Sequence, residues 1–392
     1  MRVETKKYSQ NAFIYLEGKF NLKEFYIVKS GKIKITKTND ITGVSEDFRE
    51  DGFIFGIIQC ITGVSDNETV QALTDCEILV IPKEKIEELY NEHPKIILKI
   101  LSEYSEILRK LDKDLVKIDF FSSTDKREDR VFEIAQKYVS IKEYKKAASL
   151  LKSYSFEIKD NEKGLAKTNA ILQKLPGVDI VDVIETDQLI SYKTLQPNSV
   201  VFTEYELADN FFIIKSGKVK ITKLKGDEET LLAILGEGDI FGEMAILNDK
   251  PRNATASVEE ETTLMIVDKR GINKLPPSLF VKILFYLTRR IWMVQQQIIC
   301  SNIYNAAGQI YYLLTSKLKL AGVDQKRDSE KSFTFNFPLR ELYQMLDINP
   351  QKKAEELSDF LKDNNLEFFE DCIKIRKIGA LYGKNSFYLT RG

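Results

Sequence analysis

The sequence predicts an α+β multidomain protein built from two tandem β-rolls of jelly-roll type with trailing helices, a helical insert and a C-terminal domain. The 392 residues are too many for one ordinary core. A thirteen-residue segment recurs almost unchanged 186 residues further along. Long stretches of helical sequence follow both copies. We therefore expect four domains, over residues 1–118, 119–180, 181–300 and 301–392.

The two rolls are predicted from the repeat. FYIVKSGKIKITK (25–37) and FFIIKSGKVKITK (211–223) share ten of thirteen residues. Apolar residues alternate with lysines after a Ser-Gly turn, as in a half-buried strand of a hairpin. The similarity continues without a gap from 51–81 to 237–267. A period this long indicates a duplicated domain rather than a solenoid. Short strands with glycine-rich turns predict an antiparallel roll in each copy.

Helices are predicted after each roll, over 83–117 and 277–319, and 127–158 reads as two amphipathic helices between the rolls. Within 280–298 the apolar residues step by four and three, the heptad pattern of a two-stranded coiled coil. These residues are Phe280, Leu284, Leu287, Ile291, Val294 and Ile298. The pattern predicts a homodimer through 280–298. The alternative is a helix that packs its apolar stripe on its own roll.

Composition excludes several classes of function. His93 is the single histidine, so a Ser-His-Asp triad or a histidine-ligated zinc site would depend on one residue. Because no nucleophile, base or metal cluster is evident, we expect a protein that is not an enzyme and holds no metal. The chain lacks a run of about eighteen apolar residues and an apolar leader, so no membrane partner is expected. The four scattered cysteines are typical of reduced thiols in the cytoplasm.

The two copies differ at two polar positions. Glu243 and Arg252 of the second copy correspond to Ile57 and Asp66 of the first. The guanidinium fork of arginine binds two phosphate oxygens at once, and a carboxylate accepts a hydrogen bond from a sugar hydroxyl. Gly242 permits a tight turn before a short helix, and Phe241 supplies an apolar rim. An anion site beside a hydroxyl site suits a ribose phosphate.

The segment FGEMAIL…PRNATASV resembles the phosphate-binding cassette of cyclic-nucleotide-binding domains. These domains occur in catabolite-activator (Crp/Fnr-type) regulators, in regulatory subunits of cyclic-AMP-dependent protein kinase and in cyclic-nucleotide-gated channels. The likeness covers 190–300 well and 10–118 as a degenerate copy. It implies that Glu243 binds the ribose 2′-hydroxyl and Arg252 the cyclic phosphate. Backbone amides would come from Gly242, Met244 and Ala245.

Further expectations follow from this resemblance. Asn253 departs from the family, which usually has Ser, Thr or Ala there, and it is compatible with cyclic AMP, the favoured ligand, and with cyclic GMP. The helix after the roll covers the purine in the family, so Thr288, Arg289 and Trp292 are candidate lid residues. In the first copy, the loss of both polar side chains predicts no nucleotide binding.

The last segment reads as helix, turn, helix and a two-stranded wing, and 305–385 resembles the winged helix-turn-helix of the same bacterial regulators. Asn349-Pro350 would begin the recognition helix. Gln351, Lys352 and Lys353 would then reach double-stranded DNA. Residues 301–392 contain 14 Lys or Arg and 12 Asp or Glu, a small excess for binding phosphates.

Together these features predict a cytoplasmic, dimeric transcription regulator that responds to a cyclic nucleotide. The alternative is a nucleotide-sensing scaffold that contacts proteins and does not bind DNA. The acidic residues on the expected recognition helix, Glu355, Glu356 and Asp359, keep this alternative open.

Overall fold

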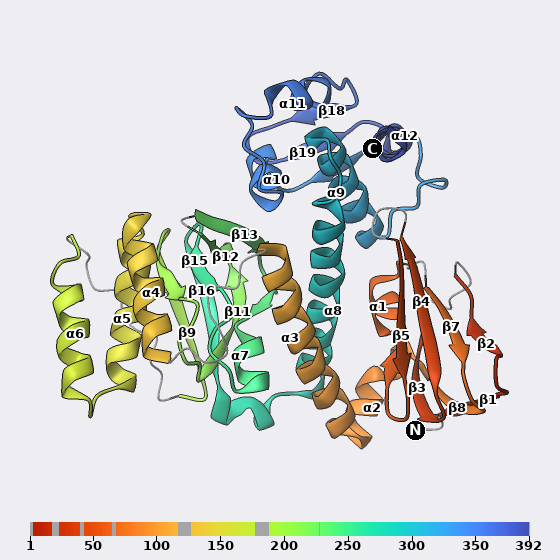
Figure 1. The fold of residues 1–392 in the computed structure, drawn as a ribbon, viewed down its shortest axis with the longest axis horizontal. Coiled ribbons are helices and arrows are strands. Elements are labelled where there is room, and N and C mark those ends of the chain that lie inside the picture. The colour runs from red at the N-terminus through yellow and green to blue at the C-terminus, as the bar shows by residue number, and fades with distance from the viewer. Residues whose placement is uncertain are drawn as a thin grey trace. The chain divides into compact units, whose positions relative to one another are not determined.

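A computed structural model describes residues 3–17, 23–39, 43–64, 68–116, 127–176, 188–226 and 228–391 (Figure 1). Its contacts form two compact units. One comprises Met1–Tyr104 with Pro277–Gly392, and the other Ser105–Pro276. Helix α3 (Pro94–Val116) crosses the boundary between them, and α8 (Pro277–Cys300) begins at the second boundary. The four domain limits expected from the sequence stay a prediction.

Roll one consists of two four-stranded antiparallel sheets. The first has the order β1 (Glu4–Tyr8), β8 (Cys76–Pro82), β3 (Glu24–Ser30), β6 (Ile54–Phe55). The second has the order β2 (Phe13–Tyr15), β7 (Glu68–Ala72), β4 (Ile33–Asn39), β5 (Gly43–Arg49). Alternate residues of these strands enclose a core that includes Val28, Ile33, Val70 and Ile78.

Roll two repeats this topology strand by strand. Its sheets have the orders β9 (Ile190–Leu195), β16 (Thr262–Asp268), β11 (Asn210–Ser216), β14 (Ile240–Phe241) and β10 (Val200–Phe202), β15 (Thr255–Val258), β12 (Val219–Lys225), β13 (Glu228–Leu235). Strands β3 and β11 lie 186 residues apart, as do helices α1 (Ile57–Thr62) and α7 (Glu243–Asn248). The predicted duplication of a β-roll is therefore confirmed.

The Ser-Gly turn explains why the repeated segment has kept its glycine. Gly31 and Gly217 have φ angles of 104° and 88°, a region that residues with a Cβ rarely adopt. A Cβ on Gly217 would lie 2.4 Å from the carbonyl oxygen of Glu261. The hairpin can therefore close only with glycine at this position.

The helix that follows roll two packs against helices of roll one. Helix α8 contacts α1 and α2 (Ile86–Glu92), and the rings of Phe280 and Tyr90 stack 4.7 Å apart. Five of the six heptad positions are buried within the single chain, whereas Ile298 is half-buried. The seam is therefore already filled without a second copy. The coiled coil and the homodimer through 280–298 stay predictions.

The insert forms three helices, α4 (Arg127–Ser140), α5 (Tyr144–Glu157) and α6 (Glu162–Leu172), of which the sequence predicted the first two. Val131, Tyr138 and Leu151 form a buried cluster with Leu224 of β12. The hydroxyl of Tyr138 lies 2.5 Å from that of Thr255. The insert is thus attached to roll two by both apolar and polar contacts.

The C-terminal segment folds around its own core. Its elements are α9 (Ala306–Leu320), β17 (Phe333–Phe335), α10 (Leu339–Met345), α11 (Ala354–Leu361), β18 (Leu366–Phe368), β19 (Ile373–Ile375) and α12 (Ile378–Arg391). The strands pair in the order β17-β19-β18. Helix α11 begins four residues after Pro350, but Asn349 accepts hydrogen bonds from the amides of Gln351 and Lys352, as a cap does.

Candidate functional site

Arg252 is the centre of the site in roll two. Its side chain is only 5% exposed. Nη1 donates to the carbonyl of Gly242 at 2.7 Å, and Nη2 donates to the carbonyl and Oδ1 of Asn210 at 2.8 and 2.9 Å. The guanidinium also lies 4.1 Å from the ring centroid of Phe202. Its buried Nε has no hydrogen-bond partner among the described residues.

Burial makes this charge costly. The pKa of Arg252 falls to about 10, chiefly because the guanidinium is removed from water. The carboxylates of Glu206 and Glu243 act in the opposite direction, whereas the positive charge of Arg109 adds to the lowering. A buried cation held mainly by neutral carbonyls is well placed to receive an anion.

The turn before α7 is shaped around this arginine. Gly242 has φ 80°, and a Cβ at this position would lie 2.5 Å from Nη1 of Arg252. Phe241 is buried beneath the turn, with its ring 5.1 Å from that of Phe212. The glycine therefore allows both the left-handed backbone and the close approach of the guanidinium.

The other residues expected at the ligand lie along α7. Glu243 is 2% exposed and interacts electrostatically with Arg252. Met244 and Ala245 are also buried. The carbonyl of Met244 accepts a hydrogen bond from Nη2 of Arg109 at 3.4 Å. The structure thus brings Phe241, Gly242, Glu243 and Arg252 together around one turn.

Asn253 contacts α3, which the sequence did not predict. Its Nδ2 donates to Oδ2 of Asp112 at 2.7 Å, and its carbonyl accepts from Nζ of Lys223 at 2.5 Å. Arg109 and Asp112 come from more than 130 residues earlier in the chain, so no local motif could reveal them. Helix α3 therefore contacts α7 through Arg109 and the loop that contains Arg252 through Asp112.

Thr288 has a different environment. It is completely buried in the unit formed by Met1–Tyr104 and Pro277–Gly392, and its hydroxyl donates to the carbonyl of Leu284 at 2.6 Å. It is not among the described residues that line the pocket beside Arg252. Its hydroxyl is used within α8, and its role at a ligand stays a prediction.

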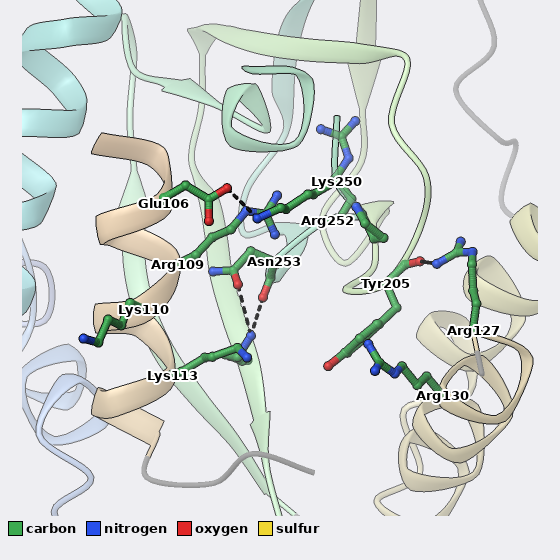
Figure 2. A pocket seen from close by; sticks show the side chains of 12 residues that line it. Glu106, Arg109, Lys110, Lys113, Arg127, Arg130, Tyr205, Lys250, Arg252 and Asn253 are labelled. Atoms are coloured by element: carbon green, nitrogen blue, oxygen red, sulfur yellow. Dashed lines mark hydrogen bonds and ion pairs between the residues drawn. The ribbon is translucent and has the colours of Figure 1, made fainter. Parts of the chain in front are cut away.

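A cavity of about 630 Å³ opens beside Arg252 (Figure 2). Helix α3 contributes one wall and α4 the opposite wall, with Tyr205 and the loop at 250–253 between them. Its volume is within the range of small-molecule sites. Its lining residues are Glu106, Arg109, Lys110, Lys113, Arg127, Arg130, Tyr205, Lys223, Lys250, Pro251, Arg252 and Asn253.

The corresponding turn of roll one is apolar. Ile57, which replaces Glu243, is 1% exposed and belongs to the core. Asp66, which replaces Arg252, lies outside the described residues. The expectation that roll one binds no nucleotide stays a prediction.

The residues expected to contact DNA lie at the surface of the C-terminal segment. Gln351, Lys352 and Lys353 are exposed and precede α11. Nζ of Lys353 lies 2.5 Å from Oε1 of Glu356, whose other oxygen accepts the amide of Ala306 at 2.8 Å. Glu356 therefore accepts a backbone amide at the start of α9 and also neutralises the charge of Lys353.

Two other features are absent from the part of the chain that the structure describes. No group of three or more His, Cys, Asp or Glu side chains could hold a metal ion there. None of the helices in these same ranges is long and apolar enough to cross a lipid bilayer.

Comparison with known proteins finds a match for each roll. The family model of the cyclic nucleotide-binding domain matches residues 5–93 and 192–276. A cAMP-dependent protein kinase regulatory subunit of Yarrowia lipolytica is 33% identical over 27% of this chain and 29% of that protein. A cyclic AMP receptor protein of Thermus thermophilus is 29% identical over 34% of this chain and 66% of that protein.

A third relative, a CRP-like cAMP-activated global transcriptional regulator of Mycobacterium tuberculosis, is 35% identical over 25% of this chain and 48% of that protein. The chain thus spans between 29% and 66% of the length of these curated relatives. One of them is named as a protein kinase regulatory subunit and another as a transcriptional regulator.

Proposed function

We propose that this protein, which carries two cyclic nucleotide-binding domains, is a transcription regulator that binds a cyclic nucleotide in roll two and duplex DNA through its C-terminal segment. The observation that carries the proposal is the position of Arg252, a buried guanidinium held by carbonyl oxygens beside Glu243. Two of the three relatives described above are named as a cyclic AMP receptor or a cAMP-activated regulator.

In this proposal the phosphate of the ligand takes the place of the carbonyl partners of Arg252. A bidentate bond from the guanidinium to an anionic phosphate is stronger than its bonds to the neutral carbonyl oxygens that the phosphate replaces. Glu243 accepts a hydrogen bond from the ribose 2′-hydroxyl, and the backbone of Gly242, Met244 and Ala245 lines the phosphate. Cyclic AMP is the favoured ligand because all three relatives bear it in their names.

Ligand binding would change the contacts that α3 makes with roll two. Arg109 contacts the carbonyl of Met244, and Asp112 accepts from Asn253, so this helix touches both sides of the loop that would hold the phosphate. A ligand shifts an equilibrium only as far as its affinity differs between the two states. Rearrangement of α7 and the 250–253 loop would alter these two contacts and supply such a difference.

The DNA-binding part of the proposal rests on the order of elements in the C-terminal segment. Two short helices, α10 and α11, precede the β18–β19 hairpin, and β17 completes the sheet. Such an arrangement suits a winged helix, with the polar surface before α11 in the major groove. Gln351 and Lys352 are exposed there and available for bases or phosphates.

A second candidate function is a regulator that contacts a protein instead of DNA. The pairing of Lys353 with Glu356 and the acidic first turn of α11, Glu355 and Glu356, favour it because they reduce the positive charge of this surface. One of the relatives is named as a regulatory subunit of a protein kinase.

Binding to a pool of duplex fragments at increasing salt separates these candidates. The proposal predicts cyclic-AMP-dependent retention of DNA that weakens steeply as salt rises, because counterions are released on binding. Lys352→Ala should weaken binding and lower the salt slope by about one unit, whereas Lys362→Ala, on the same segment, serves as the control. Failure to retain DNA by a protein that binds the nucleotide would favour the protein-contact candidate.

A further inference from the structure

The cavity beside Arg252 is strongly basic. Eight of its twelve lining residues are Lys or Arg, and Glu106 is the one acidic side chain among them. Arg109, Lys110 and Lys113 come from α3, while Arg127 and Arg130 come from α4 (Figure 2). Lys223, Lys250 and Arg252 belong to roll two. Three separate parts of the chain thus direct cations toward one volume.

Arg127 and Lys250 each have an acidic partner. Arg127 forms a bidentate pair with Glu157, with distances of 2.5 and 2.7 Å, and also donates to the carbonyl of Tyr205. Lys250 pairs with Glu106 at 2.6 Å. These pairs fix the walls of the cavity, and the lining still has a large excess of positive charge.

Arg109 and Arg252 carry like charges that repel each other. Arg109 destabilises the charged form of Arg252, and burial lowers the pKa of both groups. The Nε atoms of both side chains are buried without a hydrogen-bond partner among the described residues. An anion between them would remove the repulsion and supply the missing acceptors.

A cyclic mononucleotide carries one negative charge, and a contact with Arg252 would use it. The cations of α3 and α4 would then face no anion of the ligand. A second phosphate beyond Arg252 would meet them, and the half-buried ring of Tyr205 lies between α4 and the 250–253 loop, where a base could stack on it (Figure 2). The cavity volume of about 630 Å³ leaves room for a ligand of this size.

We propose that this cavity binds a nucleotide with at least two phosphate charges, one at Arg252 and the other between the cations of α3 and α4. The ligand would cross-link the long helix that leaves roll one to the helical insert. The site shares Arg252 with the proposed cyclic nucleotide site but depends on different residues for its second phosphate.

Isothermal titration of the full chain with cyclic AMP, ADP, cyclic di-AMP, cyclic di-GMP and inorganic pyrophosphate tests this inference. At least one probe with two phosphates should bind tenfold or more tightly than cyclic AMP. The double variant Lys113→Ala/Arg130→Ala should weaken that probe at least tenfold and change cyclic AMP affinity less than threefold. Lys145→Ala, an exposed lysine of α5 outside the cavity, is the matched control and should change neither.

The outcomes separate this inference from the proposed function. Cyclic AMP binding that requires Arg252, with no tighter binding of any two-phosphate probe, would overturn the inference and leave the proposed function intact. Binding of a two-phosphate probe that requires Lys113 and Arg130, without cyclic AMP binding, would do the reverse. Equal weakening of the probe by Lys145→Ala would show a general charge effect and overturn the inference. A melting profile of each variant confirms that it is folded.

Discussion

At the scale of single residues, the proposed site depends on a charged side chain that is almost completely removed from water. Arg252 is compensated by carbonyl oxygens, the amide oxygen of Asn210 and the face of Phe202. These groups are neutral, so they stabilise the guanidinium but do not balance its charge as an anionic phosphate would. The residue thus serves both the fold and the proposed ligand.

Replacement of Arg252 by lysine tests the importance of the fork. Lysine keeps the charge but cannot bind two phosphate oxygens in a plane. We expect both Arg252→Lys and Arg252→Ala to lose cyclic AMP affinity by about 1.5–3 kcal/mol, that is, more than tenfold. Isothermal titration measures this loss. Retention of full affinity by Arg252→Lys would show that a point charge suffices.

The turn at Gly242 gives a second residue-scale prediction. Gly242→Ala places a methyl group 2.5 Å from Nη1 of Arg252 in a left-handed conformation. We expect a loss of about 1–3 kcal/mol in the free energy of unfolding, together with weaker nucleotide binding. Gly236→Ala is the control, because a Cβ there meets no atom within 4 Å. Similar unfolding curves for the two variants would contradict this view of the turn.

Glu243 and Arg252 could be predicted from the sequence because the two rolls can be compared position by position. Roll one keeps the turn but has Ile57 where roll two has Glu243. The contacts from Arg109 and Asp112 could not be predicted in this way. They depend on the path of α3, which is separated from the loop by more than a hundred residues of sequence.

At the scale of elements, α8 shows how far a heptad pattern can be interpreted. Its apolar residues have heptad spacing, and the structure buries them within one chain against helices that include α1 and α2. Periodicity shows which face of a helix is buried, but it does not show what covers that face.

A core substitution in this seam distinguishes intrachain packing from dimerisation. Leu287→Ala should lower the free energy of unfolding by about 2–5 kcal/mol, because it leaves a cavity in a fully buried position. The sedimentation coefficient of the variant should depend on protein concentration no more than that of the wild type does. Lys282→Ala, exposed on the same helix, is the control. Dissociation of an oligomer by Leu287→Ala alone would contradict this assignment.

The contact between the insert and roll two has its own pH dependence. Burial raises the pKa of Glu204 from its ordinary value of 4.5 to about 7, although Lys223 and the amide of Leu224 favour the carboxylate. Between these two values the folded protein binds more protons than the unfolded chain. This carboxyl group therefore makes the free energy of unfolding fall as pH rises from 4.5 to 7, by up to about 3 kcal/mol.

Glu204→Gln should remove this contribution. Denaturant unfolding at several pH values should give a wild-type curve that declines more steeply between pH 4.5 and 7 than that of the variant. The exposed Glu228→Gln variant controls for a general loss of charge. Parallel curves for wild type and Glu204→Gln would show that the buried carboxyl group titrates normally.

At the scale of the whole molecule, the duplication is visible in both sequence and structure, and the same 186-residue offset relates the strands of the two rolls. The sequence predicted two rolls, the helices after them and most elements of the C-terminal segment. Helix α6, strand β17 and helix α12 were not predicted, because short or weakly patterned segments acquire their structure from the core they cover.

The structure also places the helix after each roll in a role that local sequence does not indicate. Helix α3, which follows roll one, contacts the loop of roll two that contains Arg252. Helix α8, which follows roll two, contacts α1 of roll one, the counterpart of α7. Long-range exchanges of this kind are invisible to periodicity, and they make α3 the element through which we expect ligand binding to be communicated.

Thermal unfolding of the purified chain with cyclic AMP, cyclic GMP or plain AMP, with Arg252→Ala in parallel, shows whether roll two binds a cyclic nucleotide through this arginine. A ligand at a hundred times its Kd should stabilise the folded state by about 2.7 kcal/mol. We expect a rise in Tm with a cyclic nucleotide, cyclic AMP first, that is absent with AMP and absent in the variant. An unchanged Tm with both cyclic nucleotides, or an equal rise in Arg252→Ala, would contradict this expectation.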